Sequence, residues 1–496
     1  MKKIGNFING KLIKGSSDNT IPVYNPTTGE IQSEVILSNN NDFDSAVESA
    51  KNAFVPWSNV TPLNRSRILS KYKNLLENNK EELAKLVCQE HGKTLDDAKG
   101  SVTRGIEVVE FACGIPQLLK GEFSQNVGAN IDSWSIRQPL GVCAGITPFN
   151  FPAMVPLWMF PISIACGNTF ILKPSEKNPS CSLRLAELFK EAGLLDGVFN
   201  VLNGDKEVVN YILKSKDISS VSFVGSTPVA KYIYEESGKQ GKRVQSLGGA
   251  KNHLVIMPDA NLEQTVDGIM GAAYGSAGER CMAVSVAVAV GDIADTLVNN
   301  IHEKTKQLKV LPWTDNDADM GPLISKEHLS KVSHYIDIGV KEGASLIADG
   351  RNYNLQGYEK GYFIGPSLFD HVDNSMTIYK EEIFGPVLSI VRVKTYDEAI
   401  QLVNNHPFGN GSSIYTQDGD VARHFTTNVK IGMVGVNIPI PVPMAFHSFG
   451  GWKNSFFGSH AMHGIEGVNF FTKLKTVTSR WPTSIRSGAE YKMPTN

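Results

Sequence analysis

The middle of the chain alternates between short apolar runs and longer stretches with helical periodicity. Apolar runs of four to eight residues are typical of buried strands. We predict strands at 141–146, 168–172, 198–202 and 219–224, with helices between them at 153–166, 182–192 and 206–214. Strands that alternate with helices favour right-handed crossovers and a parallel sheet. The predicted fold class is therefore α/β.

The flanking regions have other patterns. Residues 41–117 are polar-faced and mostly helical, whereas 122–139 alternate in the way of an exposed hairpin. A second α/β block is predicted from about residue 248 to 443. Residues 467–481 again alternate between apolar and polar side chains, which predicts an edge strand near the end of the chain.

Length and composition restrict the kind of protein. A chain of 496 residues suits two or three domains. Its net charge of −2 gives no reason to expect nucleic acid or an anionic membrane as a partner. The most apolar window, 151–166, is short for a bilayer and contains three prolines, so we predict a buried helix there and no membrane span. The N-terminal residues lack the features of a targeting signal, which predicts a cytoplasmic protein.

The cysteines indicate free thiols. Six cysteines in a chain of this length do not form a disulfide framework. None of them is spaced as a zinc site would require, so no metal is predicted. We therefore expect a reducing compartment.

Cys281 is the strongest candidate for chemistry, because a thiolate is a nucleophile for a carbonyl carbon. It lies between Gly278 and an apolar strand, where a side chain can be both reachable and supported. Asn150 stands in a stiff loop, Pro148-Phe149-Asn150-Phe151-Pro152, and its amide could stabilise the oxyanion that forms on thiolate addition. The competing interpretations are a buried small hydrophobic residue and a polar turn residue.

Two strand ends suggest a dinucleotide site. Lys173 and Glu176 follow one strand, where a carboxylate could bind both ribose hydroxyls and would repel a 2′-phosphate, which favours NAD over NADP. Gly225 and Ser226 end another strand and begin a helix, whose backbone N–H groups favour phosphate. The GxGxxG fingerprint is absent from this region. A surface ion pair remains the alternative for Lys173 and Glu176.

These motifs, in this order, resemble the aldehyde dehydrogenase superfamily over nearly the whole chain. The resemblance extends to Glu381-Glu382-Ile383-Phe384-Gly385-Pro386, in which it implies that Glu382 holds the nicotinamide ribose and Phe384 packs against the ring. Phe149 stands where the superfamily usually has Trp. The resemblance makes Cys281 the nucleophile and Asn150 the oxyanion donor. The implied cofactor-binding set is Phe149, Lys173, Glu176, Gly225, Ser226, Leu247, Glu382 and Phe384.

The resemblance also implies an architecture. We expect a Rossmann-like NAD-binding domain at 1–121 and 140–247, and an α/β catalytic domain at 248–443. Residues 122–139 and 444–496 would form a small β oligomerisation arm with the C-terminal segment. An arm with exposed strand edges favours a partner, so a homo-oligomer, a dimer or a tetramer, is expected.

One departure from the superfamily narrows the function. Most members have a glutamate in a Glu-Leu-Gly-Gly-Lys stretch, which acts as the base that activates water. The matching position holds Leu247, or Ser246 if the alignment shifts by one residue. Neither side chain can accept a proton at neutral pH, so hydrolysis of a thioester should be slow. A thiolate attacks a thioester unaided, which favours coenzyme A as the co-substrate.

With this departure and four further matching stretches, the sequence resembles the methylmalonate-semialdehyde dehydrogenase branch of the superfamily. The stretches are residues 249–253, 278–283, 319–324 and the proline-rich 437–443. That branch converts methylmalonate or malonate semialdehyde to propionyl- or acetyl-CoA, with NAD reduced and carbon dioxide lost. By resemblance, Arg104 and Arg280 would clamp the substrate carboxylate. The alternatives are an aldehyde dehydrogenase with another substrate that hydrolyses or phosphorylates its acyl group, and a non-enzymatic member of the fold.

Overall fold

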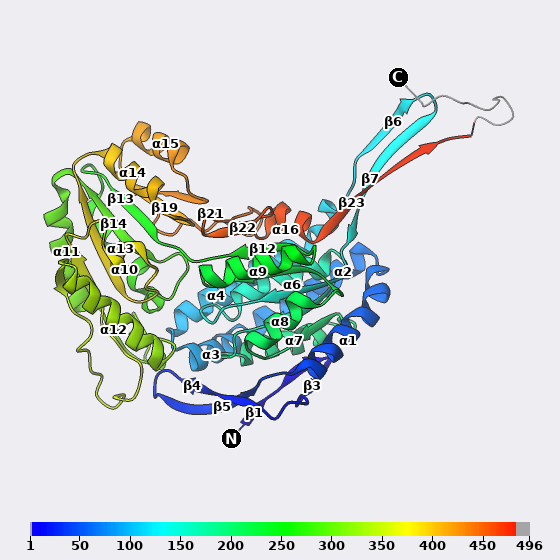
Figure 1. Ribbon diagram of the computed structural model, residues 1–496, viewed down its shortest axis with the longest axis horizontal. Coiled ribbons are helices and arrows are strands. Elements are labelled where there is room, and N and C mark those ends of the chain that lie inside the picture. The colour runs from blue at the N-terminus through cyan, green and yellow to red at the C-terminus, as the bar shows by residue number, and fades with distance from the viewer. Residues whose placement is uncertain (1, 483–496) are drawn as a thin grey trace.

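The computed structural model describes residues 2–482. Two large sheets lie side by side, and a narrow β arm projects away from them (Figure 1). The alternation of strands and helices predicted from the sequence is confirmed. Of the predicted C-terminal segment, residues 483–496 lie outside the described residues.

The first sheet has eight strands and a parallel centre. Its order is β22 (Phe456–Gly458), β12 (Arg243–Leu247), β11 (Ile218–Val224), β8 (Val142–Ile146), β9 (Thr169–Lys173), β10 (Phe199–Val201), β2 (Asn6–Ile8) and β3 (Lys11–Ile13). The run from β12 to β10 is parallel, whereas β22, β2 and β3 pair antiparallel at the edges. The carboxyl ends of the parallel strands therefore meet along one edge of the sheet.

Helices cover both faces of this sheet. The helices of this part of the chain are α1 (Asn40–Ser58), α2 (Pro62–Asn78), α3 (Lys80–His91), α4 (Leu95–Cys113), α5 (Ile115–Leu118), α6 (Met154–Ala165), α7 (Ser180–Glu191), α8 (Lys206–Lys214) and α9 (Thr227–Lys239). One core contains apolar side chains of α2, α4, α6 and α7, and a separate core contains those of α8 and α9. Every residue of α6 is buried, as expected of a helix that is apolar all round.

The second sheet has seven strands. Its order is β15 (Ser345–Ala348), β16 (Ser367–Asp370), β17 (Val387–Val393), β14 (Val284–Val290), β13 (Asn252–Ile256), β19 (Gly411–Tyr415) and β20 (Met433–Val436). Only β15 runs antiparallel to its neighbour. Its helices are α10 (Leu262–Tyr274), η1 (Gly275–Gly278), η2 (Gly291–Ile293), α11 (Ala294–Gln307), α12 (Lys326–Lys341), α13 (Thr377–Lys380), α14 (Tyr396–Asn405) and α15 (Gly419–Asn428).

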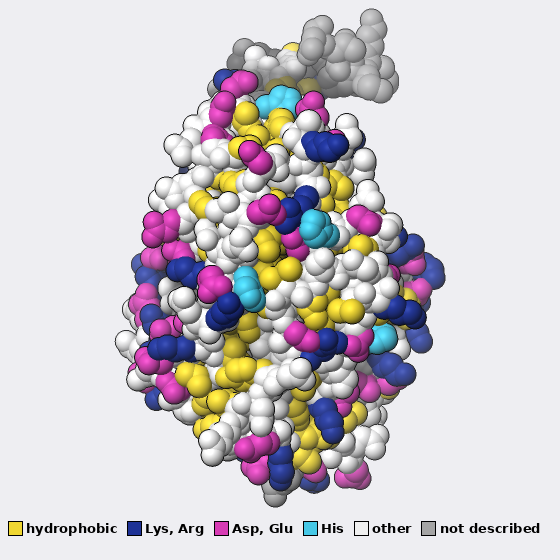
Figure 2. Space-filling view, turned by 90° about the vertical axis from the view of Figure 1, so that its left-hand side faces the viewer, with side chains coloured by type: hydrophobic (Ala, Val, Ile, Leu, Met, Phe, Trp, Pro, Cys, Tyr) yellow, Lys and Arg dark blue, Asp and Glu magenta, His cyan; other side chains and the backbone are white. Residues whose placement is uncertain are grey.

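The outer face of this second part carries acidic and basic side chains close together, without a large area of one sign among the described residues in view (Figure 2). This interleaving agrees with a net charge of −2 for the whole chain. Among residues 2–482, no helix combines the length and apolar character needed to cross a bilayer.

The remaining strands form small sheets. β1 (Lys2–Ile4), β5 (Glu30–Ile36) and β4 (Thr20–Asn25) make one, and β18 (Phe408–Gly409) pairs with β21 (Trp452–Lys453). The arm consists of β6 (Phe123–Gly128), β7 (Ile131–Pro139) and β23 (Thr472–Arg480), with β7 in the middle. The hairpin predicted at 122–139 is thus confirmed.

The strand predicted at 467–481 is wrong in its first part. Residues 467–470 belong to α16 (Gly464–Phe470), and only β23 after it is extended. A strand at this place would have pointed Phe470 and Phe471 to opposite sides. Both are almost completely buried, because the helix end turns both rings into the core beside α6.

Asn168 joins the base of the arm to the body. Its buried amide donates to the carbonyls of Ser163 at 3.0 Å and Phe471 at 2.9 Å. Its oxygen accepts from the N–H groups of Leu140 at 2.6 Å and Gly141 at 3.1 Å. One side chain therefore connects α6 with the points where the chain leaves and re-enters the arm.

We expect Asn168→Ala to lower the free energy of unfolding by about 4 kcal/mol, because four hydrogen bonds worth roughly 1 kcal/mol each are lost at a buried position. The measurement is the urea midpoint followed by circular dichroism. Asn428→Ala is the control, since Asn428 is exposed and its amide donates only to His424 of its own helix, at 2.8 Å. Equal midpoints for the two variants would contradict this role of Asn168.

Candidate active site

The nucleophile loop, residues 275–283, places Cys281 at the amino end of β14. Ser276, Ala277 and Gly278 are consecutive residues with left-handed φ angles of 54°, 51° and 70°. A Cβ on Gly278 would lie 2.2 Å from the carbonyl oxygen of Gly385, so only glycine fits there. The loop is therefore packed directly on the Gly385-Pro386 turn that precedes β17.

Two asparagines fix the backbone of Cys281, and sequence reasoning missed both. The amide of Asn252 donates to the carbonyls of Cys281 and Ala283, each at 2.9 Å. The amide of Asn410 donates to the same Cys281 carbonyl at 3.1 Å. Asn252 lies in a stretch already matched to the family, but nothing in the sequence indicates its partner. These contacts orient the thiol from β13 and from the turn before β19.

Asn150 lies in the loop that follows β8 and is buried. Its Nδ2 donates to the carbonyl oxygen of Glu279 at 3.1 Å. The predicted oxyanion donor is thus held against the nucleophile loop, two residues before Cys281. The adjacent ring of Phe149 meets the ring of Phe384 edge to face, with centroids 5.9 Å apart. The structure therefore brings these two predicted motifs together.

Cys281 lines a cavity of about 330 Å³, the substrate cavity. The predicted residues Arg104, Arg280 and Leu247 line it as well. The rest of its wall is mainly apolar, with Phe151, Met154, Trp158, Met282, Met433, Ile440, Val442 and Phe449. A small apolar site with two arginines suits an aldehyde that carries an acidic group.

Both arginines of the substrate cavity have protein partners. Arg104 Nη1 donates to Glu107 at 2.9 Å, and its Nη2 donates to the carbonyl of Pro443 at 2.6 Å. Arg280 donates to Asp97 and, at 3.2 Å, to the carbonyl of Gly271. Their side chains are 31% and 20% exposed, and both residues line the cavity.

Leu247, one of the two residues that the sequence offers for the position of the missing glutamate, faces the cavity of the nucleophile. Leu247 ends β12 and lines the substrate cavity with Cys281. Ser246 points the other way, and its hydroxyl donates to the carbonyl of Ala230 in α9 at 2.8 Å. Of the two alignments left open by the sequence, the structure therefore places Leu247 in the wall of the substrate cavity.

Residues 248–251 cross from the carboxyl edge of the first sheet to the amino edge of the second. At Gly249, the start of α9, which follows Gly225 and Ser226, comes close to Glu382. The Gly249 N–H donates to Thr227 Oγ1 at the start of α9 at 2.8 Å, and a Cβ there would lie 2.3 Å from Glu382 Oε2. The other carboxylate oxygen of Glu382 accepts from the Ala250 N–H at 2.9 Å.

The remaining cofactor candidates lie at the carboxyl edge of the first sheet. Lys173 ends β9, and its Nζ is 2.9 Å from Glu176 Oε2. Burial raises the pKa of Glu176, but Lys173 more than offsets this and holds it below its ordinary value. Gly225 and Ser226 lie between β11 and α9, and the side chain of Ser226 makes no capping hydrogen bond. The N–H groups of this helix start suit a phosphate.

Burial controls protonation around the nucleophile. It raises the pKa of Glu382 to about 7, against the lowering effects of the Ala250 N–H and Lys251. Burial, with the Glu382 charge as the second cause, raises the pKa of the Cys281 thiol to about 11. The thiol is therefore protonated at neutral pH.

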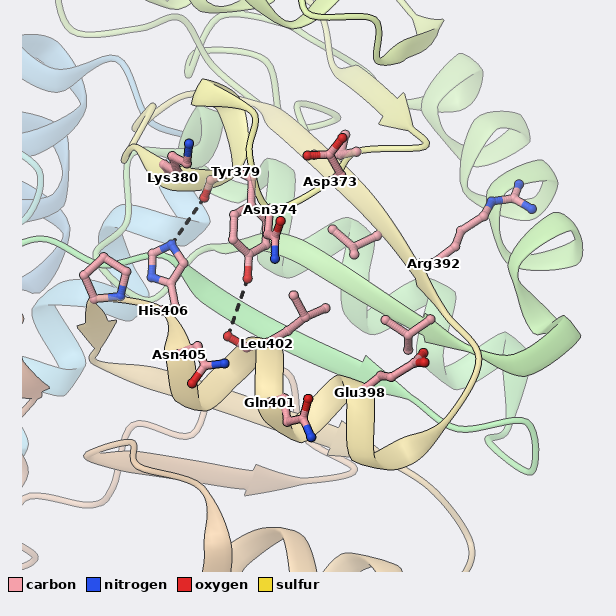
Figure 3. A pocket seen from close by; sticks show the side chains of 14 residues that line it. Asp373, Asn374, Tyr379, Lys380, Arg392, Glu398, Gln401, Leu402, Asn405 and His406 are labelled. Atoms are coloured by element: carbon pink, nitrogen blue, oxygen red, sulfur yellow. Dashed lines mark hydrogen bonds between the residues drawn. The ribbon is translucent and has the colours of Figure 1, made fainter.

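A larger cavity, of about 810 Å³, lies between β17 and α14 in the second part (Figure 3). Tyr379 and His406 line it, and the His406 ring bonds to the Tyr379 carbonyl at 3.3 Å. None of the residues predicted from the sequence to act in catalysis or binding lines it. Its size therefore does not make it the candidate site.

Comparison with known proteins agrees with this geometry. The model of the aldehyde dehydrogenase family matches residues 12–477. A malonate-semialdehyde dehydrogenase of Pseudomonas aeruginosa is 55% identical over 483 residues, which is 97% of each chain. One of Halalkalibacterium halodurans is 51% identical over 97% of this chain and 99% of its own.

Solved structures give the same result. A crystal structure from Sinorhizobium meliloti, named as a methylmalonate-semialdehyde dehydrogenase and complexed with NAD, has a TM-score of 0.97 and 54% identity. It is covered over 99% of its chain and 98% of this one. The methylmalonate-semialdehyde dehydrogenase of Oceanimonas doudoroffii has a TM-score of 0.96 and 52% identity, with the same coverage.

We expect Glu382→Gln to lower the pKa of Cys281, because a neutral amide removes the charge that disfavours a nearby thiolate. In wild type the alkylation rate with iodoacetamide, measured without NAD, should rise with pH towards about 11. In the variant the rise should begin at lower pH. Glu381→Gln is the matched control, since this exposed neighbour is not among the groups that act on the thiol. Superimposed curves for Glu382→Gln and wild type would contradict the coupling.

Proposed function

The chain belongs to the aldehyde dehydrogenase family, and from this premise we propose that it oxidises malonate or methylmalonate semialdehyde with NAD and transfers the acyl group to coenzyme A. The products would be acetyl-CoA or propionyl-CoA, carbon dioxide and NADH. Relatives named for these substrates, at 50% identity or more over nearly the whole chain, support the proposal.

The choice of coenzyme A over water as the acyl acceptor rests on Leu247. This aliphatic side chain lines the substrate cavity together with Cys281, and the resemblance matches it to the position where most of the family has its base. Without a base, water is a poor nucleophile toward a thioester. The thiolate of coenzyme A needs no such help.

The residues of the NAD site fit the cofactor. Glu176, ion-paired with Lys173, suits the adenine ribose, and the N–H groups at the start of α9 suit the phosphates. Glu382 and Phe384 stand beside Cys281, where the nicotinamide half would be held. When bound, NAD supplies the acceptor for the hydride that leaves the substrate carbon.

The chain's own residues would act as follows. Cys281 first loses its proton to solvent, and the thiolate then adds to the aldehyde carbon, while the Asn150 amide and the Cys281 backbone N–H donate to the oxyanion. After the hydride has left, the acyl group is a thioester on Sγ with a carboxylate β to the carbonyl. The bond to that carboxylate then breaks, and its electron pair forms an enolate that the same donors stabilise. Protonation and attack by coenzyme A release the product and return the thiolate.

Arg104 and Arg280 would hold the substrate carboxylate during the first steps. Both residues line the substrate cavity together with Cys281. A guanidinium binds a carboxylate through two parallel hydrogen bonds, which would select semialdehydes over simple aldehydes.

The assembly is part of the proposal. We propose that the first sheet, from 1–121 and 140–247, serves NAD, that 248–443 serves catalysis, and that the arm with 444–496 serves oligomerisation. Phe123 and Leu474 on the arm are 63% and 60% exposed, which favours a homodimer or a tetramer. All six cysteines are free, which is consistent with a cytoplasmic location.

The direct test is a reaction with malonate semialdehyde and NAD, with and without coenzyme A, read by mass spectrometry of the thioester and by release of carbon dioxide. We expect acetyl-CoA, with steady NADH formation only when coenzyme A is present. Without it, about one NADH per active site should form quickly and then almost stop. Rapid release of free acid without coenzyme A would instead indicate a hydrolytic aldehyde dehydrogenase.

We expect Leu247→Glu to raise the rate of acyl-enzyme hydrolysis without coenzyme A by roughly tenfold or more, because it supplies a base toward the thioester. Leu247→Gln is the matched control, since glutamine has nearly the same shape as glutamate and accepts no proton. Free acid is measured by chromatography after a single turnover. If the two variants hydrolyse equally, the lack of a base at this position does not explain the acceptor.

A further inference from the structure

A carboxylate lies among the cations of the substrate cavity. Asp97 lines this cavity with Arg104 and Arg280, seven residues before Arg104 on α4. One oxygen accepts from Arg280 Nη2, and the other is 3.0 Å from Lys93 Nζ. An acidic side chain in a cavity that takes an anion needs a physical reason.

The turn between α3 and α4 places Lys93 next to Asp97. Gly92 ends α3 at φ 91°, and a Cβ there would lie 2.7 Å from Pro322 Cγ. Thr94 caps α4 by accepting from the Asp97 N–H at 3.4 Å. This tight turn buries Lys93 completely, with its Nζ 4.1 Å from the centre of the Phe151 ring. A buried ammonium requires an anion close by.

Arg280 is confined from two further sides. Its Nη1 donates to the carbonyl of Gly271 on α10 at 3.2 Å, and a Cβ on Gly275 would lie 2.6 Å from the same nitrogen. The guanidinium is thus held by α4, α10 and η1. The same residue lines the substrate cavity.

The charges of Lys93, Arg280 and Asp97 add up to +1. Lys93 and Arg280 carry two positive charges and Asp97 carries one negative charge. Burial raises the pKa of Asp97, but the direct pairs with Lys93 and Arg280 hold it well below its ordinary value. The net charge of the group, +1, matches one substrate carboxylate.

We propose that Asp97 is a positioning residue for substrate specificity: it fixes the guanidinium of Arg280 toward the substrate cavity, with Lys93 as its buried counter-charge. The proposal deepens the proposed function and rests on it. Asp97 acts through Arg280, so its loss should affect aldehydes with a carboxylate far more than aldehydes without one.

The experiment compares malonate semialdehyde with propanal, which lacks the carboxylate, in the presence of NAD and coenzyme A. For Asp97→Asn we expect the ratio of the two kcat/KM values to fall roughly tenfold or more, mainly through the KM of the semialdehyde. Glu110→Gln is the control: it removes one negative charge from an exposed position on the same helix that does not line the cavity, and should keep the wild-type ratio.

A double variant separates positioning from damage to the fold. Asp97→Asn leaves Lys93 buried without a partner, whereas Lys93→Met with Asp97→Asn leaves no buried charge unpaired. The double variant should be as stable as wild type by thermal unfolding and still show the low ratio. A return to the wild-type ratio in the double variant would overturn the proposal, as would an equal loss for both substrates in Asp97→Asn.

The outcome also distinguishes this proposal from the proposed function. If wild type does not prefer the semialdehyde to propanal, the proposed substrate class is wrong. If wild type prefers it and Asp97→Asn keeps that preference, the substrate class stands and the role of Asp97 is wrong.

Discussion

The contact between Gly278 and Gly385 sets the geometry of the site. A side chain at Gly278 would collide with the Gly385 carbonyl, so the nucleophile loop can approach the turn before β17 only with glycine at this position. The strands that follow, β14 and β17, are neighbours in one sheet, and their pairing carries this approach into a fixed register. Cys281 and Glu382 therefore stand at adjacent strand starts. The first sheet adds Asn150 and Leu247 from its carboxyl edge, so the site forms where the two sheets meet.

The pKa values of two carboxylates near the site depend on their nearest partners. Glu382 accepts one N–H and has a pKa of about 7, because burial outweighs its weak support. Asp97 is held below its ordinary pKa, because Lys93 and Arg280 bind it directly. The wall of the substrate cavity thus contains charged residues, Arg104, Arg280 and Asp97, together with Cys281, whose thiol is kept neutral by burial. Such a wall suits a substrate that carries both an anionic group and a neutral carbonyl.

The sequence predicts those features that depend on local pattern. The strands between 141 and 224 are recognisable because each is apolar and buried, and the loops after them lie at one edge because the sheet is parallel. Features that depend on distant partners are not predictable in this way. Asn252 and Asn410 hold the Cys281 carbonyl across 29 and 129 residues, and the pairing of Asp97 with Arg280 spans 183. The helix at 467–470 was mistaken for a strand because tertiary burial of two adjacent rings overrides a short alternation. The strands before residue 40 have no pattern strong enough to predict.

The proposed reaction requires that a carboxylate be held and then leave as neutral carbon dioxide. A guanidinium that lost its only partner at that moment would be left unpaired in a mostly apolar cavity, which is costly. Neither arginine is in that position. Arg280 keeps Asp97 and the Gly271 carbonyl, and Arg104 keeps Glu107 and the Pro443 carbonyl. The substrate carboxylate would therefore add to pairs that already exist, and its departure would restore them. Such an arrangement binds the carboxylate well enough to select substrates that carry it. Decarboxylation does not then have to break the only ion pair of either arginine.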